Sequence, residues 1–156
     1  MLTKAQEAIR QRNLDNLIAE IESSGDIDQP DENGRTLLMW AALEGDEKAV
    51  ALLVQCGASV NIRDRKSGYS ALDFAAQEQV PEIVKILLSA GADLEARDKF
   101  GNTALYRATY YSNGRGETIK ELLAQGADPT SENEYGVSPL SLAEQIANYD
   151  IIRFFE

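Results

Sequence analysis

Apolar residues recur along the chain in short clusters, and their spacing within each cluster is that of a helix. One kind of cluster follows a Thr or Ser and places residues such as Leu38, Ala41 and Ala42 on one narrow face. Another kind ends in a pair of leucines, at 52–53, 87–88 and 122–123. Glycine and aspartate separate the clusters, as is typical of turns. The pattern predicts pairs of short helices, with the second helix of each pair at 48–55, 81–90 and 117–125.

These clusters belong to an internal repeat. One phrase occurs as GASVNIRD (57–64), GADLEARD (91–98) and GADPTSEN (126–133), with a degenerate copy, GDIDQPDE, at 25–32. Another occurs as GRTLLMWA (34–41), GYSALDFA (68–75), GNTALYRA (101–108) and GVSPLSLA (136–143). The glycines that open the second phrase, at 34, 68, 101 and 136, are 34, 33 and 35 residues apart. A period in this range is the mark of a stacked repeat protein.

The small and hydroxylated residues of the repeat have local roles. Thr36, Ser70, Thr103 and Ser138 stand where a helix begins, so their hydroxyls can cap free backbone N–H groups. Each second helix is followed by a glycine at 57, 91 or 126, where a positive φ is expected. Asp31, Asp64 and Asp98 recur at the repeat boundaries, which indicates turn-capping groups and not calcium ligands.

The combined pattern, G-x-T-x-L-x-x-A followed by L-L-x-x-G-A-D/S, resembles the ankyrin repeat, a turn plus two helices. The resemblance implies an all-α solenoid of stacked helix-turn-helix units with hairpin-like tips, as a single domain over 1–156. We divide the chain into an N-terminal cap (3–30), three repeats (31–63, 64–97, 98–132) and a C-terminal cap (133–156). The usual T-P-L-H of the family lacks its histidine in every copy, because the chain contains no histidine. Somewhat less stable tips are expected as a result.

Two irregularities interrupt the period. The second tip has one extra residue, since 64–68 corresponds to 31–34. The third repeat has about two extra residues between its helices, within 110–117.

Composition and charge narrow the function. The net charge is −11, and most of it lies at the ends: residues 1–34 carry three basic and eight acidic side chains, and residues 127–156 carry one and six. Such a chain is a poor ligand for a phosphate backbone, so we expect no nucleic-acid partner, although a basic protein partner is compatible. The single cysteine, and the lack of a long apolar run or signal peptide, predict a cytoplasmic protein that does not enter a membrane.

Candidate chemistry is sparse. Without histidine there is no Ser-His-Asp or Cys-His arrangement, and one cysteine cannot build a thiolate zinc site, so we expect neither metal nor cofactor. Cys56 is expected to be a half-buried structural residue of a second helix. Asp73 could pair with Glu44 or Glu78 as an acid and base, but acidic residues on a solvated helix face are the more ordinary interpretation. We therefore predict that the chain is not an enzyme.

The resemblance implies that partners bind along the tips and the exposed side of the first helices. Mapped onto this sequence, that surface contains Arg35, Leu43, Glu44, Arg65, Lys66, Tyr69, Asp73, Gln77, Lys99, Phe100, Tyr106, Tyr110, Tyr111 and Tyr135. Six of the chain's 11 aromatic residues are among them, and aromatics interspersed with Arg and Lys are typical of binding hot spots. Packing inside the repeat is the alternative for each, and it is the favoured one for Tyr106 and for Trp40.

The predicted function is thus non-enzymatic protein binding, by a chain that is monomeric when unbound. The Gly-Arg-Gly-Glu segment (114–117) and the C-terminal sequence from 136 resemble small bacterial ankyrin proteins of the toxin-immunity type. That resemblance implies an inhibitor that occludes a cognate toxin or effector, and an acidic inhibitor suits a basic target. A general scaffold or regulator of a cellular enzyme is the alternative.

Overall fold

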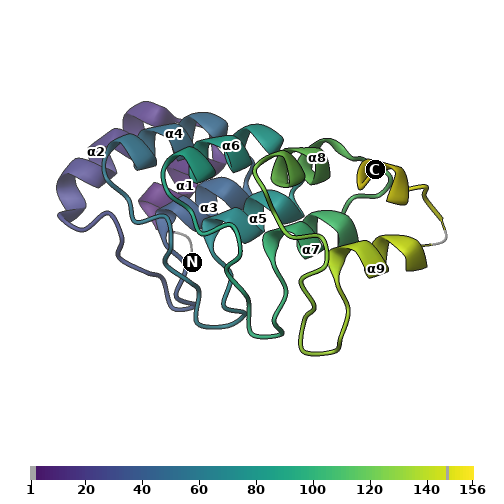
Figure 1. The fold of residues 1–156 in the computed structure, drawn as a ribbon. Coiled ribbons are helices and arrows are strands. Elements are labelled where there is room, and N and C mark those ends of the chain that lie inside the picture. Colours follow the sequence, from purple (N-terminus) through teal and green to yellow (C-terminus); the bar gives the residue numbers. More distant parts are fainter. Residues whose placement is uncertain (1–2, 147) are drawn as a thin grey trace.

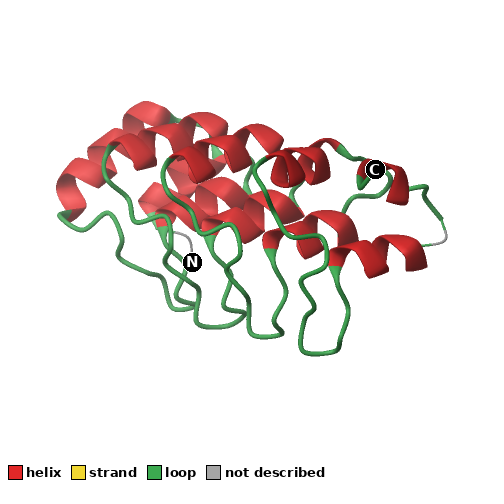
Figure 2. Cartoon of the chain, in the orientation of Figure 1, coloured by secondary structure: helices red, strands yellow, loops and turns green. Residues whose placement is uncertain are grey.

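The computed structural model describes residues 3–146 and 148–156, and these residues form helices joined by turns and loops (Figures 1 and 2). The elements are α1 (Lys4–Arg10), α2 (Leu14–Ser24), α3 (Leu37–Leu43), α4 (Glu47–Gln55), α5 (Ala71–Gln77), α6 (Pro81–Ser89), α7 (Ala104–Tyr110), α8 (Glu117–Ala124), α9 (Pro139–Gln145) and the 3-10 helix η1 (Ile152–Phe154). The predicted all-α solenoid is confirmed. Position 147, within the expected C-terminal cap, lies outside the described residues.

The helices form two layers. The odd-numbered helices, α1 to α9, pack side by side in one layer, and the even-numbered helices, α2 to α8, pack in the other (Figure 1). Small residues make the close approach of the first layer possible: Ala41, Ala42 and Ala75 are fully buried between neighbouring helices. Larger side chains from the second layer, such as Leu53 and Leu87, fill the space between the layers.

Helix caps follow the sequence pattern. The hydroxyls of Thr36, Ser70, Thr103 and Ser138 each accept a hydrogen bond from the backbone N–H three residues later. The second helix of the first repeat begins at Glu47, one residue earlier than expected, because Asp46 caps it through the N–H of Ala49. The glycines at 57, 91 and 126 have φ of 90°, 91° and 94°, as predicted. Cys56 is a correction, since it is exposed and not half-buried.

Four tips project from the first layer, at residues 31–36, 64–70, 98–103 and 133–138, and they are joined by a backbone ladder. The N–H of Arg65 donates to the carbonyl of Asn33, that of Lys99 to Ser67, and that of Glu134 to Phe100, at 3.0, 3.1 and 3.0 Å. Each acceptor directly precedes a tip glycine, so the register is the same at every step. The extra residue of the second tip is absorbed by a wider turn, in which Gly68 donates to the residue four back instead of three back.

The extra residues of the third repeat make room for the C-terminus. A side chain at Gly116 would overlap the ring of Phe154, and one at Gly114 would lie 2.9 Å from Tyr149. Lys120 of α8 lies over the same Phe154 ring, with its Nζ 5.3 Å from the ring centre. The C-terminal segment thus covers the last helix pair, in the place where a further second helix would otherwise pack.

The ladder predicts a difference between two glycines of the same conformation. Gly34 has φ +83°, and a Cβ there would lie 2.7 Å from the backbone nitrogen of Arg65; Gly136 has φ +71° and open space around it. Both Gly→Ala variants carry the strain of a left-handed residue, about 1 kcal/mol. Gly34→Ala should lose roughly a further 1–3 kcal/mol of unfolding free energy, because the tips must separate. Urea unfolding of the two variants measures the difference, and equal losses would show that the ladder does not hold the tips together.

Candidate protein-binding surface

Five of the aromatic residues selected from the sequence come together around one hollow. It has a volume of about 340 Å³, lies between the second and third tips and α7, and is lined by Tyr69, Phe100, Asn102, Tyr106, Arg107, Tyr110 and Tyr111. We call it the aromatic hollow. Its residues come from two tips and one helix, so only stacking of the repeats assembles it.

The rim of the aromatic hollow is open to solvent. Tyr110, Tyr111 and Phe100 are 59%, 38% and 47% exposed, and the rings of Tyr110 and Tyr111 meet edge to face with centroids 5.0 Å apart. Tyr69 and Tyr106 are half-buried, so each ring packs partly inside the repeat and leaves part of its surface in the hollow. Burial raises the pKa of both Tyr69 and Tyr106, so both remain neutral phenols at physiological pH.

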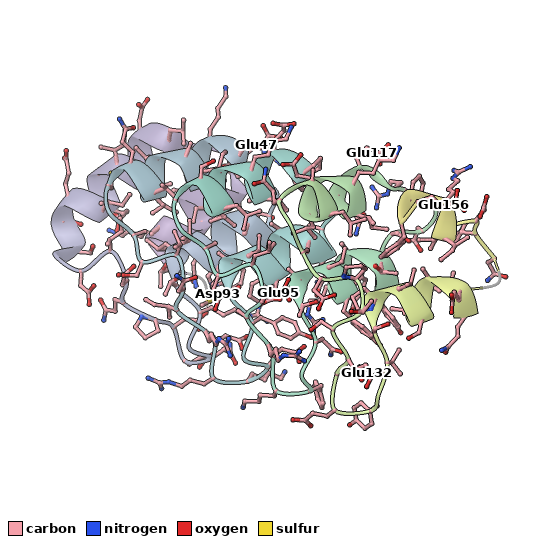
Figure 3. All side chains as sticks on the ribbon, viewed as in Figure 1. Glu47, Asp93, Glu95, Glu117, Glu132 and Glu156 are labelled. Atoms are coloured by element: carbon pink, nitrogen blue, oxygen red, sulfur yellow. The ribbon has the colours of Figure 1, made fainter. Side chains whose placement is uncertain are left out.

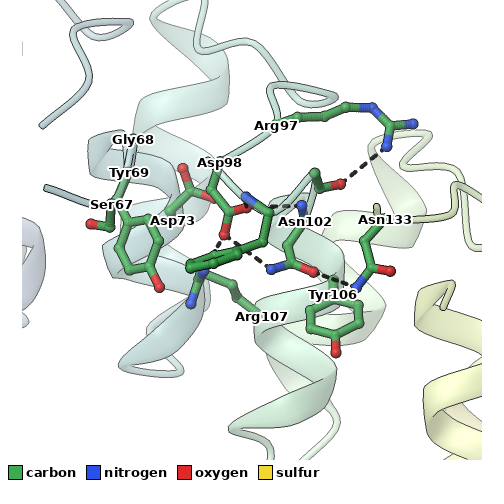
Figure 4. Close-up of polar contacts among 12 residues, drawn as sticks. Ser67, Gly68, Tyr69, Asp73, Arg97, Asp98, Asn102, Tyr106, Arg107 and Asn133 are labelled. Atoms are coloured by element: carbon green, nitrogen blue, oxygen red, sulfur yellow. Dashed lines mark hydrogen bonds and ion pairs between the residues drawn. The ribbon is translucent and has the colours of Figure 1, made fainter. Parts of the chain in front are cut away.

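A buried ion pair forms the floor. Arg107 of α7 pairs with Asp98 of the third tip, and its guanidinium lies 3.5 Å from the centre of the Tyr69 ring (Figure 4). Asp98 also accepts hydrogen bonds from the backbone N–H groups of Phe100 and Asn102. Burial acts to raise the pKa of Asp98, but the Asn102 N–H and Arg107 outweigh it and hold the pKa below its ordinary value. Asp98 is therefore ionised and fixes both the tip and the arginine.

Arg107 was not among the residues predicted from the sequence. Its position in the repeat could have indicated it, because the other copies have an apolar residue there: Trp40, Phe74 and Leu142. In the first copy the same two positions also meet: the indole N–H of Trp40 donates to Asp31 at 2.9 Å. An arginine in an otherwise apolar position predicts a buried acidic partner, and the boundary aspartate supplies it.

Asp73 requires a correction. It is 2% exposed, so its carboxylate lies inside the fold and is not part of the exposed surface, whereas Glu44 and Glu78 are exposed. One of its oxygens accepts hydrogen bonds from the N–H and the hydroxyl of Ser70, completing a capping box at the start of α5. Burial raises its pKa to about 6, despite those hydrogen bonds. Asp73 has a structural role here.

The other predicted residues lie around the aromatic hollow at different distances. Arg65, Lys66 and Lys99 are exposed at the second and third tips, and Tyr135, on the fourth tip, is 72% exposed. Arg35 is half-buried, with its Nε 3.6 Å from Asp64 and its guanidinium over Phe74. The remaining three lie near the ends of first helices and do not line the hollow: Leu43, Glu44 and Gln77.

Comparison with known proteins identifies the family. A model described as "Ankyrin repeats (3 copies)" matches residues 6–98 and 82–155. The chain belongs to the ankyrin repeat family.

Similar ankyrin proteins are found in animals. The chain is 36% identical to the E3 ubiquitin-protein ligase hecd-1 of Caenorhabditis elegans over 118 residues, which are 75% of this chain and 4% of that protein. It is 34% identical to a B-cell lymphoma 3 protein homolog of Mus musculus over 135 residues, 84% of this chain and 29% of the other. It is 42% identical to the human ankyrin repeat and SOCS box protein 6 over 108 residues, 65% and 25% of the two chains. The chain thus spans less than a third of each relative.

Membership of the family establishes the class of function. Ankyrin repeats bind other proteins and in general carry no catalytic activity of their own. In the described part of the chain, every helix is too short or too polar to span a membrane.

The raised pKa of Asp73 predicts a pH-dependent stability. The folded state holds this proton up to about pH 6 and the unfolded state only to about pH 4, so the contribution of Asp73 to stability falls as the pH rises between these values. An asparagine at this position would keep the acceptor for Ser70 without a buried charge. The free energy of unfolding of Asp73→Asn should therefore exceed that of the wild type by about 1–3 kcal/mol at pH 7.5 and by little at pH 4.

Urea unfolding of both proteins across this pH range measures the effect. Asp31 and Asp64 titrate in both proteins, so their contributions cancel in the difference. A difference that does not change with pH would contradict the assignment of a buried, late-titrating carboxylate.

Proposed function

We propose that this chain is a non-enzymatic binding module that holds one partner protein on its second to fourth tips and on α7, and that acts by covering a surface of that partner. The observation that carries the proposal is the aromatic hollow, with Tyr110, Tyr111 and Phe100 exposed at its rim. Stacking of the repeats does not require aromatic residues there, whereas large aromatics around a concave surface are what binding hot spots consist of.

Hydrogen bonds within and between the tips hold the walls of the hollow. The third tip is fixed by the ladder bonds of Lys99 and Glu134 to its neighbours and by the carboxylate of Asp98 inside the tip. Asn133 donates to the side chain of Asn102 at 2.8 Å, which ties the fourth tip to the wall of the hollow (Figure 4). A surface that is already ordered loses little entropy on binding.

The form of the activity that we favour is inhibition, by a cytoplasmic immunity protein that occludes a toxin or effector. It is supported by the resemblance of the segments at 114–117 and after 136 to small immunity-type ankyrin proteins. A scaffold or regulator of a cellular enzyme is the second candidate. It is supported by the relatives named above, which are much longer proteins with an ankyrin segment as one part.

A growth assay separates the two candidates. If the gene beside this one encodes a toxin, cells that express the toxin should grow only when this chain is expressed with it. The absence of protection, together with affinity capture that recovers only housekeeping enzymes, would favour the scaffold and overturn the immunity hypothesis.

The binding surface itself can be tested with tyrosine variants. Affinity capture from the native cell with the wild-type chain identifies the partner, and titration with that partner then compares variants. Tyr110→Ala with Tyr111→Ala should weaken binding by more than about 2 kcal/mol, because both rings lie on the rim. Thermal unfolding should hardly change, since the rings are exposed.

Ile18→Ala is a matched control, because Ile18 is an exposed apolar residue of α2, far along the chain from the hollow. It should bind as the wild type does. Normal binding by the tyrosine variant would show that the partner does not contact the rim of the hollow. Unfolding at a much lower temperature would show that the two rings stabilise the fold, and either result would refute the proposed binding surface.

A further inference from the structure

The second and third tips carry a cluster of exposed positive charge on this acidic protein. The segments 63–66 and 97–99 read RDRK and RDK, and their two aspartates are buried. Asp64 lies beside the guanidinium of Arg35 and accepts hydrogen bonds from backbone N–H groups of its own tip. Asp98 forms an ion pair with Arg107. The acidic side chains of these tips are therefore turned inward, while Arg65, Lys66 and Lys99 remain at the surface.

The three cations form one patch beside the aromatic hollow. The Nζ of Lys99 lies within hydrogen-bond distance of the carbonyl of Arg65, which brings the two tips together. Lys99 precedes Phe100, and Lys66 lies three residues before Tyr69, so cationic and aromatic side chains alternate along the same tips. We call Arg65, Lys66 and Lys99 the cationic patch.

Some of the acidic residues lie on the opposite side of the molecule (Figure 3). Glu47 and Glu117 point outward from the second layer of helices, away from the tips at the lower edge of Figure 3. On the outer tips, Glu32 and Glu134 flank the patch on both sides. The patch is thus a local reversal of the net charge of −11, bounded by negative charges.

The floor of the aromatic hollow is a buried arginine whose charge is balanced. Arg107 is 5% exposed and lines the hollow, and its Nε has no hydrogen-bond partner among the described residues. The ion pair with Asp98, made through the other end of the guanidinium, balances its charge. The floor therefore presents no unbalanced charge to an occupant, so an apolar or aromatic side chain is favoured there.

We propose that the partner segment seated on this surface is acidic and apolar together: an apolar or aromatic side chain fills the aromatic hollow, and adjacent Asp or Glu side chains contact the cationic patch. This inference rests on the proposed function and adds the chemistry of the partner. It reverses the expectation, drawn from net charge alone, that the partner is basic, because contact energies depend on the charges that meet at the interface.

Nucleic acid fits this surface less well than an acidic protein segment. Three exposed cations between two glutamates, on a chain of net charge −11, would release few counterions from a phosphate backbone. A short peptide with one or two carboxylates matches the size of both the patch and the hollow.

The test uses the full chain and a phage library of random peptides of about 12 residues. An enriched peptide is then synthesised with a fluorescent label and titrated with four proteins. These are the wild type, the tip variant Arg65→Gln/Lys66→Gln/Lys99→Gln, the hollow variant Tyr110→Ala/Tyr111→Ala, and a control, Lys4→Gln/Lys48→Gln/Lys85→Gln. The tip and control variants each remove three exposed positive charges, so they share one net charge.

The expected peptides carry Asp or Glu beside an apolar residue. The tip variant should bind them at least about tenfold more weakly, and the control as the wild type does. Affinity for the wild type should fall as ionic strength rises. A peptide with Asn and Gln in place of Asp and Glu should lose the same factor, which tests the charges without altering the protein.

Two other results would each be decisive. Neutral or basic peptides that lose binding in the hollow variant but not in the tip variant would overturn this inference and leave the proposed function standing. Peptides that bind all four proteins equally, or a library without enrichment, would overturn both. Binding of a labelled oligo-dT strand that only the tip variant abolishes would assign the patch to nucleic acid and overturn the acidic-segment proposal.

Discussion

The placement of one side chain at each repeat boundary governs the rest of the surface. The carboxylates of Asp31, Asp64 and Asp98 accept N–H groups from their own tips, and Asn133 does the same with its amide oxygen. A tip closed in this way presents its next backbone N–H and carbonyl to its neighbours, so the ladder between tips can form. Because hydrogen bonds outweigh the burial that would raise their pKa, the three aspartates lie below their ordinary pKa and remain charged.

In the third repeat the boundary aspartate has a different side-chain partner. Where the first repeat sets an indole N–H against its aspartate, the third sets the guanidinium of Arg107. The ion pair allows an arginine to lie under Tyr69 in a position that is apolar in the other copies of the repeat. The same inward use of Asp64 and Asp98 leaves Arg65, Lys66 and Lys99 unopposed at the surface. One set of buried aspartates therefore shapes both the floor of the hollow and the charge beside it.

Repetition made much of the fold predictable. Local chemistry, repeated in each copy, accounts for the hydroxyl caps and for the positive φ of Gly57, Gly91 and Gly126. It also accounts for the second helices, whose ends lie within two residues of the predicted positions. The predictions that were wrong concerned how deeply a side chain is buried. Asp73 was assigned to the surface and is buried in a capping box, and Cys56 was expected to be half-buried and is exposed. A position in the period gives the direction of a side chain on its helix, but neighbouring repeats determine how much of it they cover.

The sequence alone determined the repeat, the helix pairs, the family and the set of aromatic residues from which the candidate surface is built. Tertiary structure decided which of them meet: Tyr69, Phe100, Tyr106, Tyr110 and Tyr111 surround one hollow, whereas Tyr135 stands apart. It also showed that Gly114 and Gly116 accommodate Tyr149 and Phe154 of the C-terminal segment, which explains the extra residues of the third repeat. Helix and turn propensities act over a few neighbours and can be read along the chain. Contacts between stacked repeats join residues about 30 or more positions apart, and their geometry exists only once the stack has formed.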